Sequence, residues 1–358
     1  MSENSCRFTE HTLDHGMRAV TLENDILSVT LLPEKGADIY SLVYKPREMD
    51  VLWKAPWGLK RPGTGFHTAG ENTEVIWMDH YTGGWQEIFP NGGDECTYKG
   101  GLLCFHGEVS TLPWDYTVTT SSSDKLSVEF CVRLYRSPFS VRRTVTVERG
   151  LAAVLLSEKI TNEAEEEMHF MWGHHPAYGA PFLSEDCRIQ VPAKTFKAHD
   201  VEIAPTGRFA GGTEGDWPLV KGKDGSEIDL SVMPDTDIRT AELGYLCDLD
   251  DGWYAITNQA HDFGIGLAWP EEIFSYLWFW KELKGSFGYP WYGNAYVMAL
   301  EPFTSIPGSG LVNAIEKGTA RLLNAGESIE ADLAAVFFEG TGEIQSISRD
   351  GTVAHAQG

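Results

Sequence analysis

The sequence predicts an all-β protein, with residues 1–340 forming a single large antiparallel β-sandwich. Three observations support this fold class. Apolar and polar residues alternate with a period of two in many segments, and turn signals rich in Gly and Pro recur along the chain. No segment keeps a helical period beyond about two turns. The chain has 358 residues with 37 Gly and 17 Pro, and one large sandwich can accommodate this length.

The clearest strands come from the first half of the chain. Apolar residues alternate with polar ones over residues 27–31 and again over residues 126–134, which is typical of half-buried antiparallel strands. Two further apolar segments, residues 141–147 and 151–156, flank Arg149-Gly150. Because glycine adopts positive φ without strain, this arrangement predicts a β-hairpin.

Two strands in the second half carry more specific information. In residues 263–269, Gly264 and Gly266 leave one face nearly bare, so we expect another backbone or a ligand to approach it closely. In residues 295–301, the residues that share a face with Glu301 are all small. Its carboxylate is therefore expected over open space, and Pro302 is expected to end that strand.

The remaining segments are expected to be irregular. Residues 81–93 contain glycines near both ends and are predicted to form a long loop, and residues 210–225 are predicted to form a surface loop. Residues 341–358 are predicted to form a flexible C-terminal tail.

Charge and composition limit the class of partner. The chain has 28 Lys and Arg against 52 Asp and Glu, a net charge of −24, which disfavours nucleic acid and anionic membranes. No apolar run reaches the roughly 18 residues of a membrane span, and the N-terminus lacks the layout of a signal peptide. The six cysteines form no CxxC pair and are expected to be free thiols. We therefore expect a cytoplasmic protein whose partner is a small molecule.

Histidines are the first candidates for chemistry, because imidazole exchanges protons near neutral pH. His106 follows a short apolar run and precedes a glycine, and His174 and His175 are adjacent. Neighbours in a strand point to opposite faces, so only one of these two can enter a cleft, and the pattern favours His175 weakly. A hydrogen-bonded structural histidine is the alternative for each. No HxH or HExxH spacing is present, so no metal is expected.

Aromatic residues are the second signal. Flat rings with a polar edge suit a sugar, which has both apolar C–H faces and hydroxyl groups. Most of the 12 Trp are expected to fill the core. Trp280, and Gln86 in the segment 81–93, are candidate sugar contacts.

Several short segments within residues 22–339, taken together and in order, resemble the galactose mutarotase-like (aldose 1-epimerase) superfamily. They are residues 31–39 (LLPEKGADI), 84–93 (GWQEIFPNGG), His106-Gly107, Thr161-Asn162, 173–178 (GHHPAY) and 301–304 (EPFT). The resemblance implies a large antiparallel β-supersandwich.

The resemblance also implies an acid–base pair that acts on an aldose without a cofactor. Glu301 matches the general base that deprotonates the C1 hydroxyl, His175 the general acid that protonates the ring oxygen, and His106 a second histidine near that oxygen. Because a nearby opposite charge favours ionisation, the expected state is a carboxylate beside a cationic imidazole. An acidic residue that binds sugar hydroxyls is assigned to Asp248, with Asp250 and Asp251 as alternatives.

The leading hypothesis is thus an aldose 1-epimerase, or mutarotase, for a hexose or substituted hexose. A non-catalytic carbohydrate-binding protein on the same fold is the alternative, and a polysaccharide-cleaving enzyme is disfavoured by the negative charge. Residues 84–93 replace an Asn-Arg segment of the galactose-specific enzymes. The sequence therefore does not determine whether the substrate is a neutral, phosphorylated or acidic aldose. It does not determine the oligomeric state either.

Overall fold

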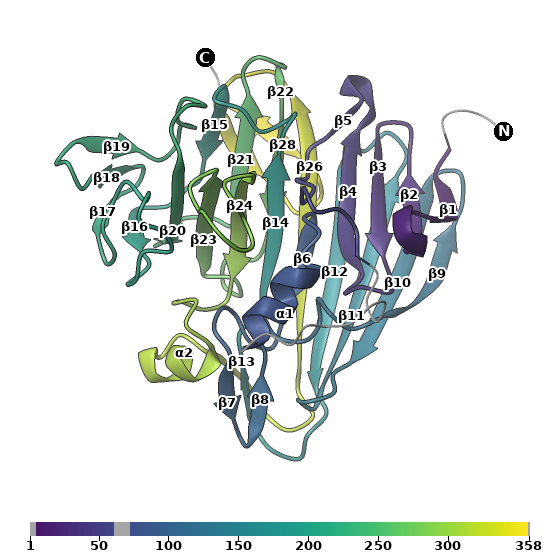
Figure 1. Ribbon diagram of the computed structural model, residues 1–358. Helices are drawn as coiled ribbons and strands as arrows, with labels where there is room; N and C mark the ends of the chain where they lie inside the picture. Colours follow the sequence, from purple (N-terminus) through teal and green to yellow (C-terminus); the bar gives the residue numbers. More distant parts are fainter. Residues whose placement is uncertain (1–4, 61–71, 357–358) are drawn as a thin grey trace.

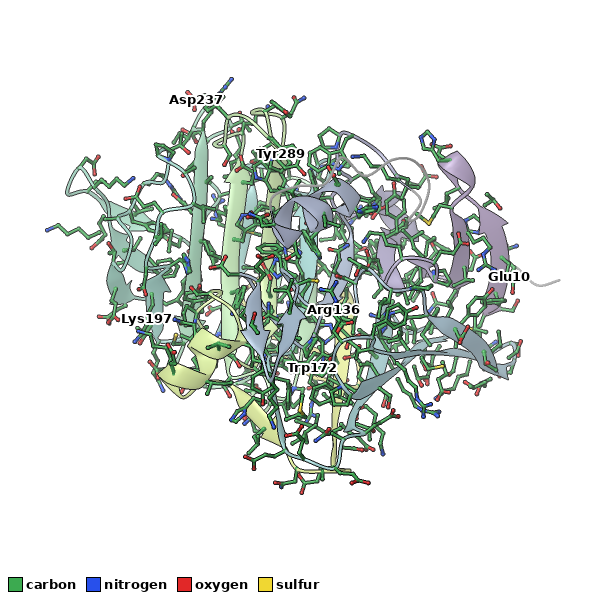
Figure 2. The ribbon with its side chains drawn as sticks, turned by 60° about the horizontal axis from the view of Figure 1, so that its bottom comes forward. Glu10, Arg136, Trp172, Lys197, Asp237 and Tyr289 are labelled. Atoms are coloured by element: carbon green, nitrogen blue, oxygen red, sulfur yellow. The ribbon has the colours of Figure 1, made fainter. Side chains whose placement is uncertain are left out.

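Two β-sheets pack face to face in the computed structural model, which describes residues 5–60 and 72–356 (Figure 1). The larger sheet contains, in spatial order, β1 (Arg7–Thr12), β2 (Arg18–Glu23), β3 (Leu27–Leu32), β4 (Asp38–Tyr44), β6 (Trp85–Ile88), β14 (Gly173–Gly179), β24 (Tyr296–Phe303), β23 (Tyr276–Leu283), β20 (Thr240–Cys247), β16 (Thr195–Ala198) and β17 (Glu214–Asp216), with β5 (Met49–Asp50) beside β4. Figure 2 shows Glu10 on the edge strand β1 and Lys197 on β16, next to the other edge strand β17, at opposite sides of the molecule.

The second sheet contains, in spatial order, β15 (Cys187–Gln190), β21 (Trp253–Asn258), β22 (Phe263–Ala268), β26 (Ser328–Glu339), β12 (Ala153–Asn162), β11 (Phe139–Glu148), β10 (Lys125–Arg133) and β9 (Asp115–Ser121). Small two-stranded ribbons in the described part of the chain pair β7 (Cys96–Tyr98) with β8 (Gly101–Leu103), β13 (Met168–Phe170) with β25 (Arg321–Leu323), β18 (Leu219–Lys221) with β19 (Glu227–Asp229), and β27 (Ile344–Ile347) with β28 (Val353–His355). The α-helices of the described residues are α1 (Thr73–His80) and α2 (Leu311–Lys317), and short 3₁₀ helices span Asp14–Gly16 and Lys45–Arg47.

The all-β prediction is confirmed, and so are the strands that the alternation indicates. Residues 27–31 lie in β3, residues 126–133 in β10, and β11 pairs antiparallel with β12 as the predicted hairpin. Their apolar faces meet between the two sheets, where Val128, Phe130 and Val145 are fully buried. None of the described helices is long and apolar enough to cross a membrane.

Segments expected to be irregular form strands instead. In the segment 81–93, predicted to be a loop, β6 is an interior strand between β4 and β14. Its polar residues Gln86 and Glu87 are buried because distant segments supply their partners, which no local pattern reveals. Residues 210–225 include β17 and β18, and β24 continues past Pro302 because both of its neighbours keep pairing with it.

The predicted C-terminal tail is also a folded element in its described part. Residues 341–356 include the hairpin β27–β28, whose Ile344 and Ile347 are buried. This hairpin covers the bare face of β22: a Cβ on Gly266 would lie 2.1 Å from Cδ1 of Ile347. The small residues of β22 therefore accommodate the chain's own C-terminal segment.

We expect that Ile347→Ala lowers the free energy of unfolding by about 2–4 kcal/mol, since it leaves a cavity against the second sheet. Urea denaturation measures this change. Gln345→Ala, on the exposed side of the same strand, should change it by less than about 0.5 kcal/mol. Equal, small effects of both substitutions would show that the hairpin does not pack on β22.

Candidate functional site

A pocket of about 250 Å³ opens on the face of the larger sheet that points away from the second sheet. This volume is close to that of the smaller pockets that bind small molecules. Helix α1 lies over β6 and β14 on this face (Figure 1) and contributes part of the wall. The lining residues that carry chemistry or aromatic rings include Glu301, His175, His106, His199, Trp77, Tyr81, Phe105, Trp278, Trp280 and Trp291.

Glu301 and His175 are neighbours on adjacent strands. β24 pairs antiparallel with β14, and the register Gly173↔Phe303 and Ala177↔Ala299 places the two residues opposite each other. His175 Nε2 lies 3.6 Å from Glu301 Oε1. Val297 and Ala299, which share Glu301's face of β24, are small, and Glu301 lines the pocket. The two side chains therefore lie side by side, and a ligand that reaches both would lie over them rather than between them.

Both groups are buried and incompletely hydrogen-bonded. Glu301 is 2% exposed and His175 is 5% exposed. Glu301 Oε2 and His175 Nδ1 have no hydrogen-bond partner within the described residues. Buried polar atoms are normally paired, so these free atoms mark where a polar ligand can bind.

Burial also sets the protonation of the pair. It raises the pKa of the Glu301 carboxyl well above its usual range and lowers the pKa of the His175 imidazole to about 4. Burial therefore favours the uncharged forms, a carboxylic acid and a neutral imidazole, over the expected ion pair, because desolvation opposes both charges. The two arrangements differ only in which group carries the one transferable proton. In either arrangement, the pair therefore offers one proton donor and one proton acceptor.

His106 forms a second imidazole at the same pocket. It follows β8 and adopts φ +57°, a conformation that is uncommon outside glycine. Gly107 comes next, where a Cβ would lie 2.2 Å from the Phe89 carbonyl oxygen. The Gly93 N–H donates to His106 Nδ1 at 3.1 Å, and burial lowers the pKa of His106 well below its usual range. The neutral ring thus carries its proton on Nε2.

Aromatic side chains surround the imidazoles. Trp280, a candidate sugar contact in the sequence, lines the pocket, with its ring 5.6 Å from that of His175 and 5.5 Å from that of Trp291. The loop that carries Trp291 contacts α1: the Tyr289 hydroxyl donates a hydrogen bond to the Val75 carbonyl oxygen at 3.0 Å (Figure 2). These rings offer flat apolar surfaces close to the polar pair.

His174 points the other way, into the space between the sheets. Its Nε2 lies 3.1 Å from Glu158 Oε2, and the Trp85 indole donates to its Nδ1 at 3.3 Å. His174 is fully buried, in a polar cluster that includes Arg143 and Glu87. The regular pairing of β14 with β6 keeps the strand parity that separates the two adjacent histidines.

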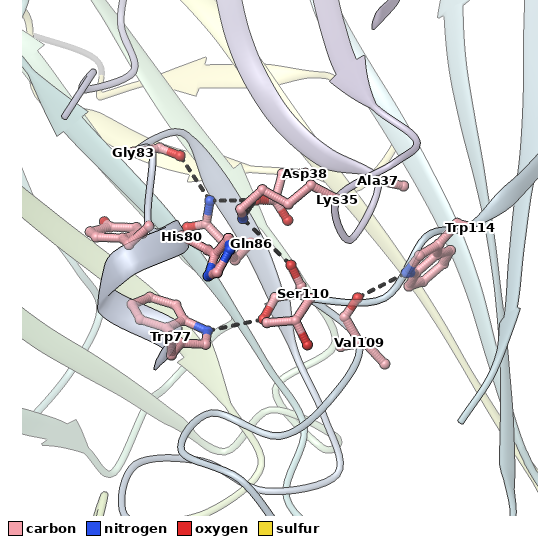
Figure 3. A network of polar contacts seen from close by, with 12 residues as sticks. Lys35, Ala37, Asp38, Trp77, His80, Gly83, Gln86, Val109, Ser110 and Trp114 are labelled. Atoms are coloured by element: carbon pink, nitrogen blue, oxygen red, sulfur yellow. Dashed lines mark hydrogen bonds and ion pairs between the residues drawn. The ribbon is translucent and has the colours of Figure 1, made fainter. Parts of the chain in front are cut away.

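The structure does not bring Gln86 to the pocket surface. Its amide Nε2 donates to Asp38 Oδ2 at 2.9 Å and to the Gly83 carbonyl oxygen at 2.8 Å, and Asp38 is paired with Lys35 (Figure 3). Ser110 continues this network by accepting from the Trp77 indole at 3.0 Å. Gln86 therefore lies in a network behind the pocket, and its sequence-based role as a sugar contact is not supported.

The acidic residue expected to bind sugar hydroxyls is also elsewhere. Asp248 is exposed in the turn after β20, where it accepts from the Thr195 hydroxyl at 2.8 Å. Asp250 pairs with Lys194, and Asp251 accepts from the Gly252 N–H. None of the three aspartates is among the lining residues, because the strand ends before it reaches them and the turn directs them to solvent.

Other lining residues were missed in the sequence. Trp77 and Tyr81 belong to α1 and its C-terminal end, a segment too short to give a helical pattern. His199 lies in a loop, with its Nδ1 2.5 Å from the Tyr245 hydroxyl. Within residues 5–60 and 72–356, no three His, Cys, Asp or Glu side chains are grouped as metal ligands.

Comparisons with known proteins agree with this architecture. The model of a domain of unknown function, DUF4432, matches residues 14–213. A candidate aldose 1-epimerase from Klebsiella pneumoniae has a similar structure, with a TM-score of 0.74 and 16% identity, over 95% of this chain and 85% of that one. A galactose mutarotase-like protein from Clostridium acetobutylicum gives 0.64 and 16%, over 94% and 99%. One from Lactobacillus casei gives 0.57 and 19%, over 88% and 99%. No curated protein matches the sequence.

Proposed function

The chain belongs to the DUF4432 family and has the galactose mutarotase-like fold, and from this premise we propose that it is an aldose 1-epimerase. It would interconvert the α and β anomers of a hexose or substituted hexose by opening and reclosing the sugar ring. The observation that carries this proposal is the pair of Glu301 and His175, with His175 Nε2 3.6 Å from Glu301 Oε1, in a pocket walled by aromatic rings.

The pair suits the proton transfers of this reaction. Ring opening takes a proton from the C1 hydroxyl and gives one to the ring oxygen, while the bond between C1 and the ring oxygen breaks. With the protonation that burial favours, the His175 imidazole accepts the first proton and the Glu301 carboxylic acid donates the second. The pair is then an imidazolium beside a carboxylate, and the sugar is an open-chain aldehyde.

Reclosure restores the pair. The aldehyde rotates about the C1–C2 bond, and the former ring oxygen attacks the other face of C1. Glu301 takes back the proton of that oxygen, and His175 returns its proton to the carbonyl oxygen. No net proton or electron is consumed, so the cycle needs no cofactor. The roles in opening are the reverse of those that the resemblance implies, because burial favours the protonated form of the Glu301 carboxyl.

His106 would assist without transferring a proton of its own. Its neutral ring lines the same pocket, 5.9 Å from that of His175 between ring centres, and carries its proton on Nε2. This N–H is a suitable donor to a sugar oxygen whose charge changes during ring opening.

The pH profile of kcat/KM is expected to be flat around neutrality and to fall as the pH drops through about 4. Below this value the pair binds a second proton, which converts His175 to a cation and removes the base. The alkaline limb is expected only well above the usual carboxyl range, when the pair loses its last proton. Polarimetry corrected for uncatalysed exchange measures the profile. An acid limb near the ordinary imidazole value of about 6.5 would show that burial does not control His175.

The proposed function is tested by adding the protein to freshly dissolved α-D-glucose, α-D-galactose, α-D-xylose and glucose 6-phosphate. Polarimetry then follows anomer exchange, and tryptophan fluorescence follows binding. Acceleration for at least one sugar supports the epimerase. Binding without acceleration of any sugar would favour the non-catalytic carbohydrate-binding protein.

A further inference from the structure

Tyr81 is a pocket residue whose buried hydroxyl the acid–base cycle leaves unused. Tyr81 is 1% exposed and lines the pocket. Its hydroxyl oxygen has no hydrogen-bond partner within the described residues. A buried tyrosine hydroxyl usually finds a partner, because leaving it unpaired is costly. An unpaired hydroxyl at a pocket therefore indicates a partner that arrives with the ligand.

The position of Tyr81 is fixed from several sides. It follows α1, where its N–H donates to the Met78 carbonyl oxygen at 3.2 Å. Its own carbonyl oxygen accepts from the Trp57 indole at 2.8 Å. Its ring stacks on Trp77 with centres 4.7 Å apart and lies 5.6 Å from Trp53. The ring cannot swing toward another partner without breaking this packing, so the hydroxyl is preorganised.

Tyr81 also lies beside the acid–base pair. Its ring meets that of His175 edge to face, with centres 5.5 Å apart and planes at 83°. Burial and the nearby carboxyl groups of Glu301 and Asp38 raise the pKa of Tyr81 well above its usual value. The phenol therefore keeps its proton throughout the working pH range and acts as a hydrogen-bond donor, not as a base.

We propose that Tyr81 is a third catalytic residue, whose hydroxyl donates a hydrogen bond to a sugar oxygen of the reacting O–C–O unit. This inference rests on the proposed function. Glu301 and His175 move protons to and from these oxygens, and Tyr81 would stabilise the oxygen on which negative charge develops. A donor fixed in place before the substrate binds needs no reorganisation during the reaction, which is why such contacts are effective.

The test is Tyr81→Phe, which removes only the hydroxyl and keeps the aromatic packing. We expect kcat/KM for anomer exchange to fall by about 10- to 100-fold, the usual effect of losing one such donor. The melting temperature should stay the same or rise, because the unpaired hydroxyl contributes nothing to the stability of the empty protein.

Tyr254→Phe is the matched control. Tyr254 is also fully buried, but its hydroxyl is paired with that of Tyr178 at 2.7 Å, and it does not line the pocket. Its replacement should lower the melting temperature and leave kcat/KM unchanged. The two tyrosines thus separate a ligand contact from a structural hydrogen bond.

Two results would overturn the inference: unchanged kcat/KM in Tyr81→Phe, or a loss of activity accompanied by a fall in melting temperature like that of Tyr254→Phe. Failure of the proposed function itself gives a different result, namely no anomer exchange by the unaltered protein on any sugar of the panel. The Tyr81 contact is then assessed from the Kd of the sugar that binds. A Kd raised about tenfold or more in Tyr81→Phe supports the contact, and an equal Kd overturns it.

Discussion

Replacing Glu301 with Gln is expected to lower the rate of anomer exchange by about 10²- to 10⁴-fold, the usual contribution of a positioned proton-transfer group. The amide has nearly the same shape as the neutral carboxylic acid that burial favours at this position. Sugar binding and the melting temperature should therefore stay close to those of the unaltered protein. Saturation-transfer NMR between the anomeric protons measures exchange at equilibrium, and fluorescence titration measures binding.

Asp248→Asn is the matched control for this substitution. Asp248 is exposed and lies outside the pocket lining, so its amide variant should keep both kcat and KM. Loss of binding and exchange to the same extent in Glu301→Gln would assign Glu301 to sugar binding rather than proton transfer. Loss of activity in Asp248→Asn would instead support the role in binding sugar hydroxyls that the resemblance implies for Asp248.

His175→Asn is expected to have the second large effect, a fall in turnover of about 10²- to 10⁴-fold. Asparagine occupies part of the imidazole volume but cannot accept and return a proton. His175 Nδ1 has no hydrogen-bond partner within the described residues, so replacing this side chain should change the melting temperature little. Turnover comes from the NMR exchange rate, and stability from thermal unfolding.

His174→Asn provides the contrast, because its neighbour in sequence faces the core. Loss of the contacts with Glu158 and Trp85 leaves buried polar groups unpaired, which should cost about 1–3 kcal/mol of stability. Turnover of the folded fraction should fall much less than in His175→Asn. A large loss of turnover in His174→Asn with little loss in His175→Asn would show that His174 rather than His175 faces the substrate.

Much of the fold could be predicted because it follows from local alternation. β3, β10 and the hairpin β11–β12 each have one apolar face, which a period of two reveals directly. β6 could not be found in this way. It is buried on both faces and contains Gln86 and Glu87, whose partners Asp38 and Trp172 come from distant segments. The folded chain brings these hydrogen-bond partners together, and no local sequence pattern shows that they will meet.

The candidate site follows the same division. Glu301 was recognisable as a lone carboxylate on a face of small residues, and strand parity left only one of two adjacent histidines for the pocket. Tyr81 could not be identified, because its significance lies in a missing hydrogen bond rather than in its neighbours in sequence. The protonation of the pair also required the structure, since it depends on burial that no motif encodes.

The most direct test of the central claim is a crystal structure of the Glu301→Gln variant soaked with the aldose that binds best. The account predicts one sugar in the pocket, with its C1 oxygen and ring oxygen within hydrogen-bonding distance of the side chains at positions 301 and 175. A sugar bound with C1 directed to the pocket mouth, or bound only at another surface, would contradict it.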